Sequence, residues 1–398
     1  MTSKLDDRGE TGASMEPLIP EEASRHRSAL TDLSLDLAMK STALSASLPA
    51  GMRPALAGLV RSMNCYYSNL IEGHNTHPID IERALRQDFS ADPEKRNLQL
   101  EAVSHILVQG WIDGGGLTES PLHPESLKEI HARFCEGLPE ELLVQEGLDG
   151  KMIPMTPGAF RDGFVRVGAH IPPSPGAVPR LLDHLHRMFG FQGKAGKIIY
   201  AACAHHRLVW VHPFPDLNGR VSRMVAHAML SESVGSAGLW SASRGLGRNA
   251  EEYKRRLAAA DAPRPGGADG RGALSEARLA EFASFFLEKC IDQVEFMQGL
   301  MRPAELRGRV MEWAGREERR GQVLKGSDRI LAALLMEGEI DRGVVPNMLG
   351  VSDRQARKVT SRLLELEAIV SDSPRAPLRV HFPASLASSW MPGLFPEK

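Results

Sequence analysis

The sequence predicts a mainly α-helical protein that ends in a small α+β domain, and three observations support this fold class. Along most of the first 301 residues, apolar side chains recur at i, i+3 and i+4, which is the spacing of one helix face. One segment before residue 320 reads as a strand, Phe164–Val167, after the turn residues Asp162-Gly163. Beyond about Gln322 the pattern changes to three short helices and a candidate hairpin.

The helices before residue 301 are predicted from their apolar periodicity and from the residues at their ends. The second of them ends at Gly73, a residue type that commonly closes helices. The stretch 262–272 is rich in proline and glycine and predicts a loop, after which Ser275 is the expected N-cap of the next helix. The predicted helices are 24–48, 52–71, 81–85, 95–111, 124–136, 179–189, 197–211 and 276–301.

The C-terminal elements are three helices followed by a hairpin, an order that indicates a winged helix-turn-helix. The helices are predicted over 327–336, 343–349 and 353–367, and the hairpin over 368–370 and 378–380. We therefore divide the chain into a disordered lead-in at 1–23, an N-terminal helical region at 24–111, a core at 112–301, a connecting helix at 302–321 and a winged helix-turn-helix domain at 322–398.

Composition excludes several classes of protein. Lys and Arg number 48 against 50 Asp and Glu, so no overall charge attracts the chain to nucleic acid or membrane. No window approaches the ~20 apolar residues that span a bilayer. The four cysteines lie far apart without a C-x-x-C pair, which argues against a structural zinc site or a disulfide framework. The polar N-terminus is not a signal peptide, so we expect a cytoplasmic protein with reduced thiols and no membrane partner.

The segment that carries chemistry is a loop between two predicted helices, with the sequence HPFPDLNGR from His212 to Arg220. Pro213 disfavours helical geometry at His212, so the preceding helix is expected to end there. The next helix is expected to start near Gly219. A loop that leads into a helix N-terminus presents free N–H groups and the positive end of the helix dipole, which together favour phosphate binding.

The charged residues of this loop fit a polyphosphate. Arg220 and Arg223 share a face in the first helical turn, where cations are disfavoured unless an anion binds. Asp216 supplies one oxygen ligand, which suits Mg²⁺ held mainly by phosphate. His212 is the group there that can accept a proton near neutral pH. A lone histidine before proline is more often a buried core residue or a cap, but the four features together favour nucleotide chemistry.

The same nine residues resemble the signature of the Fic family, H-P-F-x-D/E-G-N-G-R, at every specified position except one. The resemblance implies a helical Fic core over 112–301 with a β-hairpin flap, and transfer of AMP from ATP to a Ser, Thr or Tyr hydroxyl of a protein. His212 is then the general base and Phe214 anchors the loop in the core. Glycine at position 219 favours AMP transfer over the phosphotransferase branch of the family, which has lysine there.

The resemblance also implies the contacts to the nucleotide. Asp216 binds the Mg²⁺ that bridges the α- and β-phosphates, and Asn218 contacts the α-phosphate. Gly219 lets the backbone approach the phosphates, while Arg220 and Arg223 hold the β/γ end.

Leu217 is the departure from the signature, because the family has glycine at this position. A positive φ is costly for leucine, and its side chain lies beside the nucleotide, which bears on rate and nucleotide choice. Residues 244–246 and 252–254 lie where the family lines its adenine pocket.

Ser68, Glu72 and Gly73 resemble the family's inhibitory motif, S/T-x-x-x-E-G/N. The resemblance implies that helix 52–71 inserts Glu72 into the nucleotide site. There it pairs with Arg223, or less favourably with Arg220, so that ATP binds unproductively. The alternative is that Glu72 pairs with a neighbour at the end of its helix.

Residues 160–163, followed by Val165, Arg166, Val167 and Gly168, resemble the flap hairpin of the family. Such a hairpin clamps a segment of the target protein by strand addition, which orients a hydroxyl without demanding much sequence. The alternative is a hairpin that only covers the core.

Basic residues gather on the outward face of the predicted helix 353–367. Arg354, Arg357, Lys358 and Arg362 lie opposite its apolar face, which suits the major groove of DNA. The alternative is a solvated helix in a domain that packs against its neighbour or against a second subunit in a homodimer, since acidic residues lower the charge of the domain.

We therefore expect an autoinhibited protein AMP-transferase that uses ATP and Mg²⁺ and modifies an unidentified target protein or itself. Two alternatives stay open. One is a DNA-binding transcriptional regulator whose Fic core only senses a nucleotide, and Leu217 favours it. The other is a hydrolase that removes AMP from a modified protein with a water positioned by Glu72.

Overall fold

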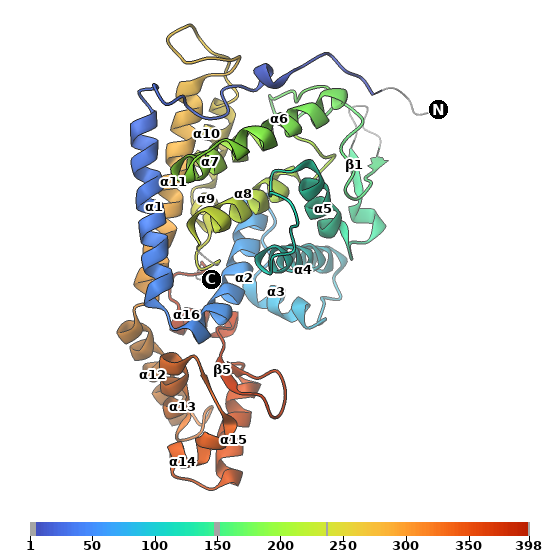
Figure 1. Ribbon diagram of the computed structural model, residues 1–398. Helices are drawn as coiled ribbons and strands as arrows, with labels where there is room; N and C mark the ends of the chain where they lie inside the picture. The colour runs from blue at the N-terminus through green and yellow to red at the C-terminus, as the bar shows by residue number, and fades with distance from the viewer. Residues whose placement is uncertain (1–4, 147–151, 236–237, 397–398) are drawn as a thin grey trace.

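The computed structural model describes residues 5–146, 152–235 and 238–396, and confirms the mainly α-helical fold class. Figure 1 shows a larger helical part and, below it, a smaller C-terminal part. The α-helices of the larger part are α1 (Arg27–Ser47), α2 (Arg53–Ile71), α3 (Pro78–Leu85), α4 (Pro93–Asp113), α5 (Pro124–Cys135), α6 (Val178–Gly190), α7 (Lys194–Val211), α8 (Asn218–Val234), α9 (Ala242–Gly247), α10 (Ala250–Ala259) and α11 (Glu276–Leu300). Short 3-10 helices lie at η1 (Gly12–Ser14), η2 (Ala50–Met52), η3 (Glu140–Leu142) and η4 (Pro175–Ala177).

Helices α7 and α8 form the centre of the larger part. They pack against each other, and the long helices α1 and α11 run side by side along one flank (Figure 1). α7 is buried on nearly all sides because it is built from apolar and small residues, including Ile199, Ala201 and Ala204. Small side chains let the neighbouring helices approach closely. This arrangement fixes both helices that flank the loop 212–217.

The N-terminal segment 5–26 is ordered, so the prediction of a disordered lead-in at 1–23 is wrong for the described residues. Met15 and Leu18 are buried, and the carbonyl of Pro17 accepts from the buried guanidinium of Arg207 at 2.9 and 3.1 Å. The polar composition misled the prediction, because a few apolar residues and many hydrogen bonds hold the segment against α6, α7 and α11.

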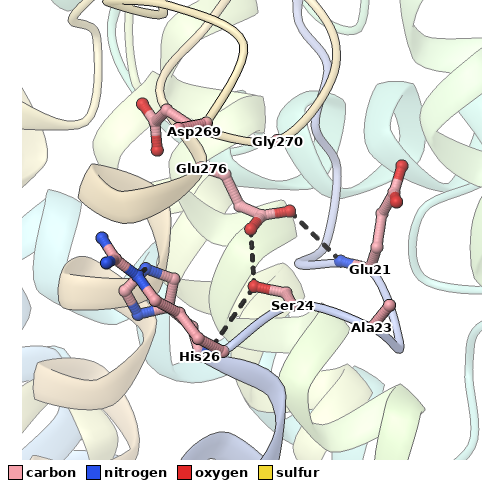
Figure 2. A pocket seen from close by; sticks show the side chains of 9 residues that line it. Glu21, Ala23, Ser24, His26, Asp269, Gly270 and Glu276 are labelled. Carbon is pink, nitrogen blue, oxygen red and sulfur yellow. Dashed lines mark hydrogen bonds between the residues drawn. The ribbon is translucent and has the colours of Figure 1, made fainter.

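Figure 2 shows a surface pocket where this segment crosses the start of α11. The Glu276 carboxylate accepts from the Ser24 hydroxyl at 2.5 Å and from the Glu21 amide at 3.3 Å. Both of its oxygens are therefore used in fastening the N-terminal segment.

The first half of the chain holds a hairpin at a place that the sequence did not indicate. Strands β1 (Val144–Glu146) and β2 (Met152–Pro154) pair antiparallel with Val144 opposite Pro154. The predicted strand Phe164–Val167 is wrong, since only a single bridge joins Val167 to His170 around a two-residue turn. Pro172 and Pro173 follow and have no N–H to donate, so a returning strand cannot extend the ladder.

The C-terminal part contains the three predicted helices and the predicted hairpin. Its elements are α12 (Pro303–Arg319), α13 (Ser327–Glu337), β3 (Glu339–Ile340), η5 (Arg342–Val344), α14 (Val345–Leu349), α15 (Asp353–Glu365), β4 (Ile369–Val370), β5 (Leu378–Val380) and α16 (Ala384–Trp390). The three strands form one antiparallel sheet in the order β3-β5-β4. Ser352 caps α15 with a capping box to Gln355. The assignment as a winged helix stays a prediction.

The end of the chain returns to the larger part (Figure 1). Leu394 is fully buried, and its carbonyl accepts from the Tyr67 hydroxyl of α2 at 3.1 Å. The ring of Phe395 packs edge-on against Tyr66 at 5.8 Å. In the described part of the chain, no helix combines the length and apolar content needed to cross a bilayer.

Candidate active site

The loop between α7 and α8 runs from His212 to Leu217 and is bounded by two residues in left-handed conformation. His212 has φ 49° and ψ 63°, and Leu217 has φ 63° and ψ 7°. The helix ends before Pro213 as predicted, and Leu217 adopts the positive φ that the family's glycine would take without strain. Backbone conformations of this kind cost about 1–3 kcal/mol for residues other than glycine, so the surrounding structure must hold them.

Asn218 and Phe214 hold the loop in shape. The Asn218 amide accepts from the Phe214 N–H and donates to the Phe214 carbonyl, both at 2.9 Å. The Phe214 ring is fully buried and stacks on His131 at 4.1 Å with an interplanar angle of 8°. The Asn218 side chain therefore closes the loop, and its predicted α-phosphate contact stays a prediction. The sequence analysis missed His131, for which the spacing along the chain gives no signal.

His212 is partly buried and neutral at pH 7. Burial lowers the pKa of its imidazole to about 4, against an opposing contribution from the Val209 carbonyl. The Arg161 and His170 charges lower the pKa further, whereas the Glu72 carboxylate raises it. Its Nδ1 atom is buried without a hydrogen-bond partner. A neutral ring can accept a proton, which is the property a general base needs.

Arg220 is buried and paired with groups that the sequence analysis did not single out. Its Nη2 donates to Glu101 of α4 at 2.6 Å and lies 2.8 Å from Nδ1 of His74. Burial opposes ionisation of Glu101, but His74 and Arg220 outweigh it and lower the pKa of that carboxyl. The carboxylate of Glu101 therefore explains why a cation is stable at the N-terminal turn of α8, where the helix dipole is unfavourable for it.

Arg223 pairs with Glu72, as the sequence analysis expected. Its Nη2 donates to Oε1 of Glu72 at 2.5 Å, and its Nε donates to the hydroxyl of the fully buried Ser68 at 2.9 Å. Burial opposes ionisation of Glu72, yet the charge of Arg223 prevails and lowers the pKa of the carboxyl. Glu72 is the C-cap of α2, and Gly73 directly after it has φ +90°.

Gly219 makes room for this ion pair. A Cβ atom at position 219 would lie 2.4 Å from Oε1 of Glu72 and 3.2 Å from Arg223. Any larger residue would therefore push the Glu72 carboxylate out of its place. The glycine that the sequence analysis assigned to phosphate approach here receives the carboxylate of α2.

Asp216 is the candidate metal ligand in this loop. Its side chain is exposed, and its Oδ1 accepts from the Leu217 N–H at 2.6 Å. Among the described residues, no group of three or more His, Cys, Asp or Glu is placed to hold a metal ion. A single exposed carboxylate fits Mg²⁺ whose other ligands are phosphate oxygens and water.

The segment after residue 160 lies against the loop through two side chains. The Arg161 guanidinium donates to the His212 carbonyl at 2.7 Å, and Nε2 of His170 donates to the Trp210 carbonyl at 2.8 Å. Arg166, Val167 and the turn residue Gly168 are exposed, while Val165 is half-buried. Arg161 and His170 therefore fasten this segment to the end of α7 and to His212, although Phe164–Val167 does not form the predicted strand.

Arg244, in a segment expected to line the adenine pocket, makes other contacts in the structure. This guanidinium is buried and donates to Gln293 at 2.7 Å and to the Gly393 carbonyl at 2.6 Å. It also stacks over the Phe296 ring at 3.6 Å. Arg244 therefore holds the C-terminal segment, and Leu246 beside it is buried in the core. A contact with the end of the chain has no signal in the local sequence.

The basic residues of α15 differ from those of the core in exposure and in ion pairing. Arg354, Arg357 and Lys358 are exposed, and within the described ranges none of them has an ion-pair partner. Arg362 instead donates to the Gln322 carbonyl at 2.6 Å and to Glu365 at 2.9 Å. Three of the four predicted DNA-contacting residues are therefore available for an anion.

The helical core gathers a histidine, two arginines and a carboxylate around a short loop, and in this region the chain carries a Fic domain. Residues 121–230, which include this loop, match the Fic/DOC family. The chain is 28% identical over 167 residues to proteins named Protein adenylyltransferase Fic from Drosophila sechellia and Drosophila melanogaster. The matched region covers 42% of this chain and about a third, 31%, of the relatives' length.

Solved structures share the fold over a longer stretch. A Fic family protein from Desulfovibrio desulfuricans G20 superposes with a TM-score of 0.54 at 18% identity, over 91% of this chain and 98% of that one. Fic-1 (aa134–508) from C. elegans gives a TM-score of 0.52 at 16% identity, over 70% and 74% of the two chains. At these identities the likeness is one of fold.

Proposed function

We propose that the protein is an autoinhibited AMP-transferase that modifies a hydroxyl of a target protein or of itself. The observation that carries the proposal is the Glu72–Arg223 ion pair, which lies against Gly219 beside the His212 loop. A carboxylate of α2 occupies the guanidinium that is suited to hold the terminal phosphates of ATP. The relatives named Protein adenylyltransferase Fic support the type of reaction.

The transfer step uses His212 as a base. The target hydroxyl oxygen attacks the α-phosphorus, the bond to the β-phosphate oxygen breaks, and pyrophosphate leaves. The hydroxyl proton passes to the imidazole, whose Nε2 is the nitrogen left for it because Nδ1 is buried. Asp216 would hold Mg²⁺, which would supply positive charge to stabilise the leaving group.

The test is mass spectrometry and labelling of the full chain with α-labelled ATP and Mg²⁺. Wild-type protein labels weakly, and Glu72→Gly raises labelling about 5–150-fold, the range of a typical coupling free energy. Adding His212→Ala to Glu72→Gly lowers labelling about 10²–10⁴-fold. The matched control Glu94→Gly, at an exposed helix end, stays at the wild-type level.

An unlabelled Glu72→Gly protein that still binds ATP with Mg²⁺ would contradict the proposal. Labelling that survives His212→Ala would contradict the assignment of the base.

A second candidate function, DNA binding by the C-terminal part, is favoured by the exposed and unpaired Arg354, Arg357 and Lys358. In this function the Fic core senses a nucleotide and α15 enters the major groove. Anisotropy titration of duplex DNA, with and without ATP, tests it. Binding that is specific in sequence and changes with ATP supports the regulator, whereas sequence-blind binding lost in moderate salt does not.

A further inference from the structure

Arg161 is a buried cation that the proposed transfer chemistry does not use. Its side chain is 2% exposed, and it has no ion-pair partner in the part of the chain that the structure describes. Burial lowers the pKa of the guanidinium to about 10, with only a small opposing contribution from Glu10. Burying an uncompensated charge is unfavourable, so other contacts must stabilise it.

Backbone carbonyls supply those contacts. Nε donates to the His212 carbonyl at 2.7 Å, Nη1 to the Gly163 carbonyl at 3.0 Å, and Nη2 to the carbonyls of Pro173 and Val211. Hydrogen bonds from a charged donor are stronger than those from a neutral one. The four carbonyls come from two separate segments, the end of α7 and the stretch 163–173. The guanidinium therefore cross-links them.

One of these carbonyls belongs to the strained residue His212. The left-handed conformation turns its carbonyl out of the α7 ladder, and Pro213 after it has no N–H with which to stabilise the turn. The amide of Arg161 also donates to the Pro213 carbonyl at 2.9 Å. Arg161 thus contacts three consecutive carbonyls, those of Val211, His212 and Pro213.

We propose that Arg161 is a positioning residue that fixes the backbone of His212 and locks it to segment 163–173, so that the base and the target-binding flap share one geometry. This inference rests on the proposed AMP transfer. The guanidinium of Arg161 is buried among backbone carbonyls and acts through His212. Because the planar guanidinium serves both segments at once, a lysine with a single ammonium group replaces it only in part.

The inference predicts a change in the pKa of His212 when Arg161 is replaced. The charged and titratable groups that act on this imidazole are Arg161, His170 and Glu72. Removing the Arg161 charge and loosening the packing raise the pKa of His212 from about 4 toward its ordinary value of 6.5. A merely structural role would lower the amount of folded protein and leave this pKa unchanged.

The experiment compares Arg161→Gln and Arg161→Lys in the full-length Glu72→Gly background. The matched control is Arg207→Gln, because Arg207 is also buried, also has a pKa of about 10 and also donates to carbonyls, those of Pro17 and Ala260. Labelling per folded molecule is measured against pH and ATP concentration. Histidine ring signals are titrated by NMR in the wild-type background as well.

We expect Arg161→Gln to lower kcat about 100-fold, the effect of a ~1 Å misplacement, while KM for ATP changes by less than about threefold. The acid limb of the pH profile moves up by about one unit or more. Arg161→Lys gives an intermediate result, and Arg207→Gln leaves kcat per folded molecule and the acid limb unchanged.

A loss of labelling with an unmoved acid limb, or an equal effect of Arg207→Gln, overturns the inference. The NMR titration of wild-type and Arg161→Gln protein needs no activity, so it tests the role of Arg161 even where Glu72→Gly does not label. If Arg161→Gln does not fold, the titration of Arg161→Lys decides.

Discussion

The cations of the Fic core and those of α15 meet opposite conditions. In the core, Arg161, Arg207, Arg220 and Arg223 are each at most 5% exposed and each donates to carbonyls or carboxylates of the protein itself. On α15 the basic side chains Arg354, Arg357 and Lys358 are exposed and lack ion pairs in the described ranges. The difference teaches that the buried cations are paired within the protein in this state, whereas the exposed ones are available for a partner.

We expect acid to lower the stability of the helical core before it changes the exposed basic face of α15, and this is the largest effect that we expect. Burial lowers the pKa values of four core histidines to between about 3 and about 4, namely His131, His205, His206 and His212. Between pH 6.5 and 4 the unfolded chain binds protons at these residues and the native state does not, so stability falls as pH falls. Each such histidine contributes a slope of about 1.4 kcal/mol per pH unit.

The measurement is denaturant unfolding at pH 7, 6 and 5, with hydrogen exchange read separately for the core and for residues 322–396. The lowered pKa values of Glu72 and Glu101 stabilise the native state above their ordinary value of 4.5, so their contribution is lost only at pH values below the range of this measurement. A stability that is flat between pH 7 and 5 would show that these histidines already titrate in the folded protein.

Arg223→Ala in the Glu72→Gly background should lower labelling by about 10²–10³-fold, because it removes a preorganised cation from the charge that develops on the phosphates. Arg357→Ala in the same background should leave labelling unchanged. Steady-state labelling with circular dichroism as a check of folding makes the comparison. Equal losses in both variants would mean that the distinction between committed and available cations is wrong.

Replacing Arg354, Arg357 and Lys358 together by alanine should weaken binding to duplex DNA without affecting labelling. Each lost phosphate contact lowers the slope of log K against log[salt] by about 0.9, so the three together should lower it by about 2.7. Anisotropy at several salt concentrations measures the slope. Arg362→Ala is the matched control, since that side chain is already bonded to Gln322 and Glu365. An unchanged slope in the triple variant contradicts DNA contact through α15.

Leu217→Gly should give the smallest effect. Glycine relieves a left-handed conformation that costs leucine about 1–2 kcal/mol, but it also loses partial packing and gains freedom in the unfolded chain. We expect a net stability change within about 1 kcal/mol and a modest rise in labelling, measured by thermal melting and by labelling in the Glu72→Gly background. A large loss of stability would show that the leucine side chain, rather than the loop backbone, holds this position.

Sequence alone predicted the helices well and the irregular segments poorly. α2, α7 and α15 have strong apolar periodicity and clear end residues, so their bounds were found within a few residues. The flap was predicted as strands because Phe164–Val167 alternates suitably, but pairing depends on a partner segment that the local pattern does not contain. Residues 1–23 were predicted to be disordered because composition does not reveal the buried guanidinium of Arg207 that binds Pro17.

In the candidate site, too, some residues could be predicted from the sequence and others could not. His212, Glu72 and Arg223 follow from short motifs, and the ion pair between the last two was predicted and is present. Glu101, His74 and the four-carbonyl role of Arg161 depend on contacts between distant segments, so no local spacing indicates them. Motifs therefore indicated the candidate site residues, and coordinates were needed for the groups that hold them in place.

The return of the chain end to α2 has a mechanical consequence. The hydroxyl of Tyr67, which directly precedes Ser68, donates to the Leu394 carbonyl across 327 residues of sequence. The guanidinium of Arg244 donates to the carbonyl of the neighbouring Gly393. A salt bridge also joins Arg86, the C-cap of α3, to Glu367, and the Ala384 amide donates to Glu82 of α3. A movement of α12 through α16 away from the larger part must therefore either displace α2, whose C-cap is Glu72, or break these hydrogen bonds and the salt bridge first.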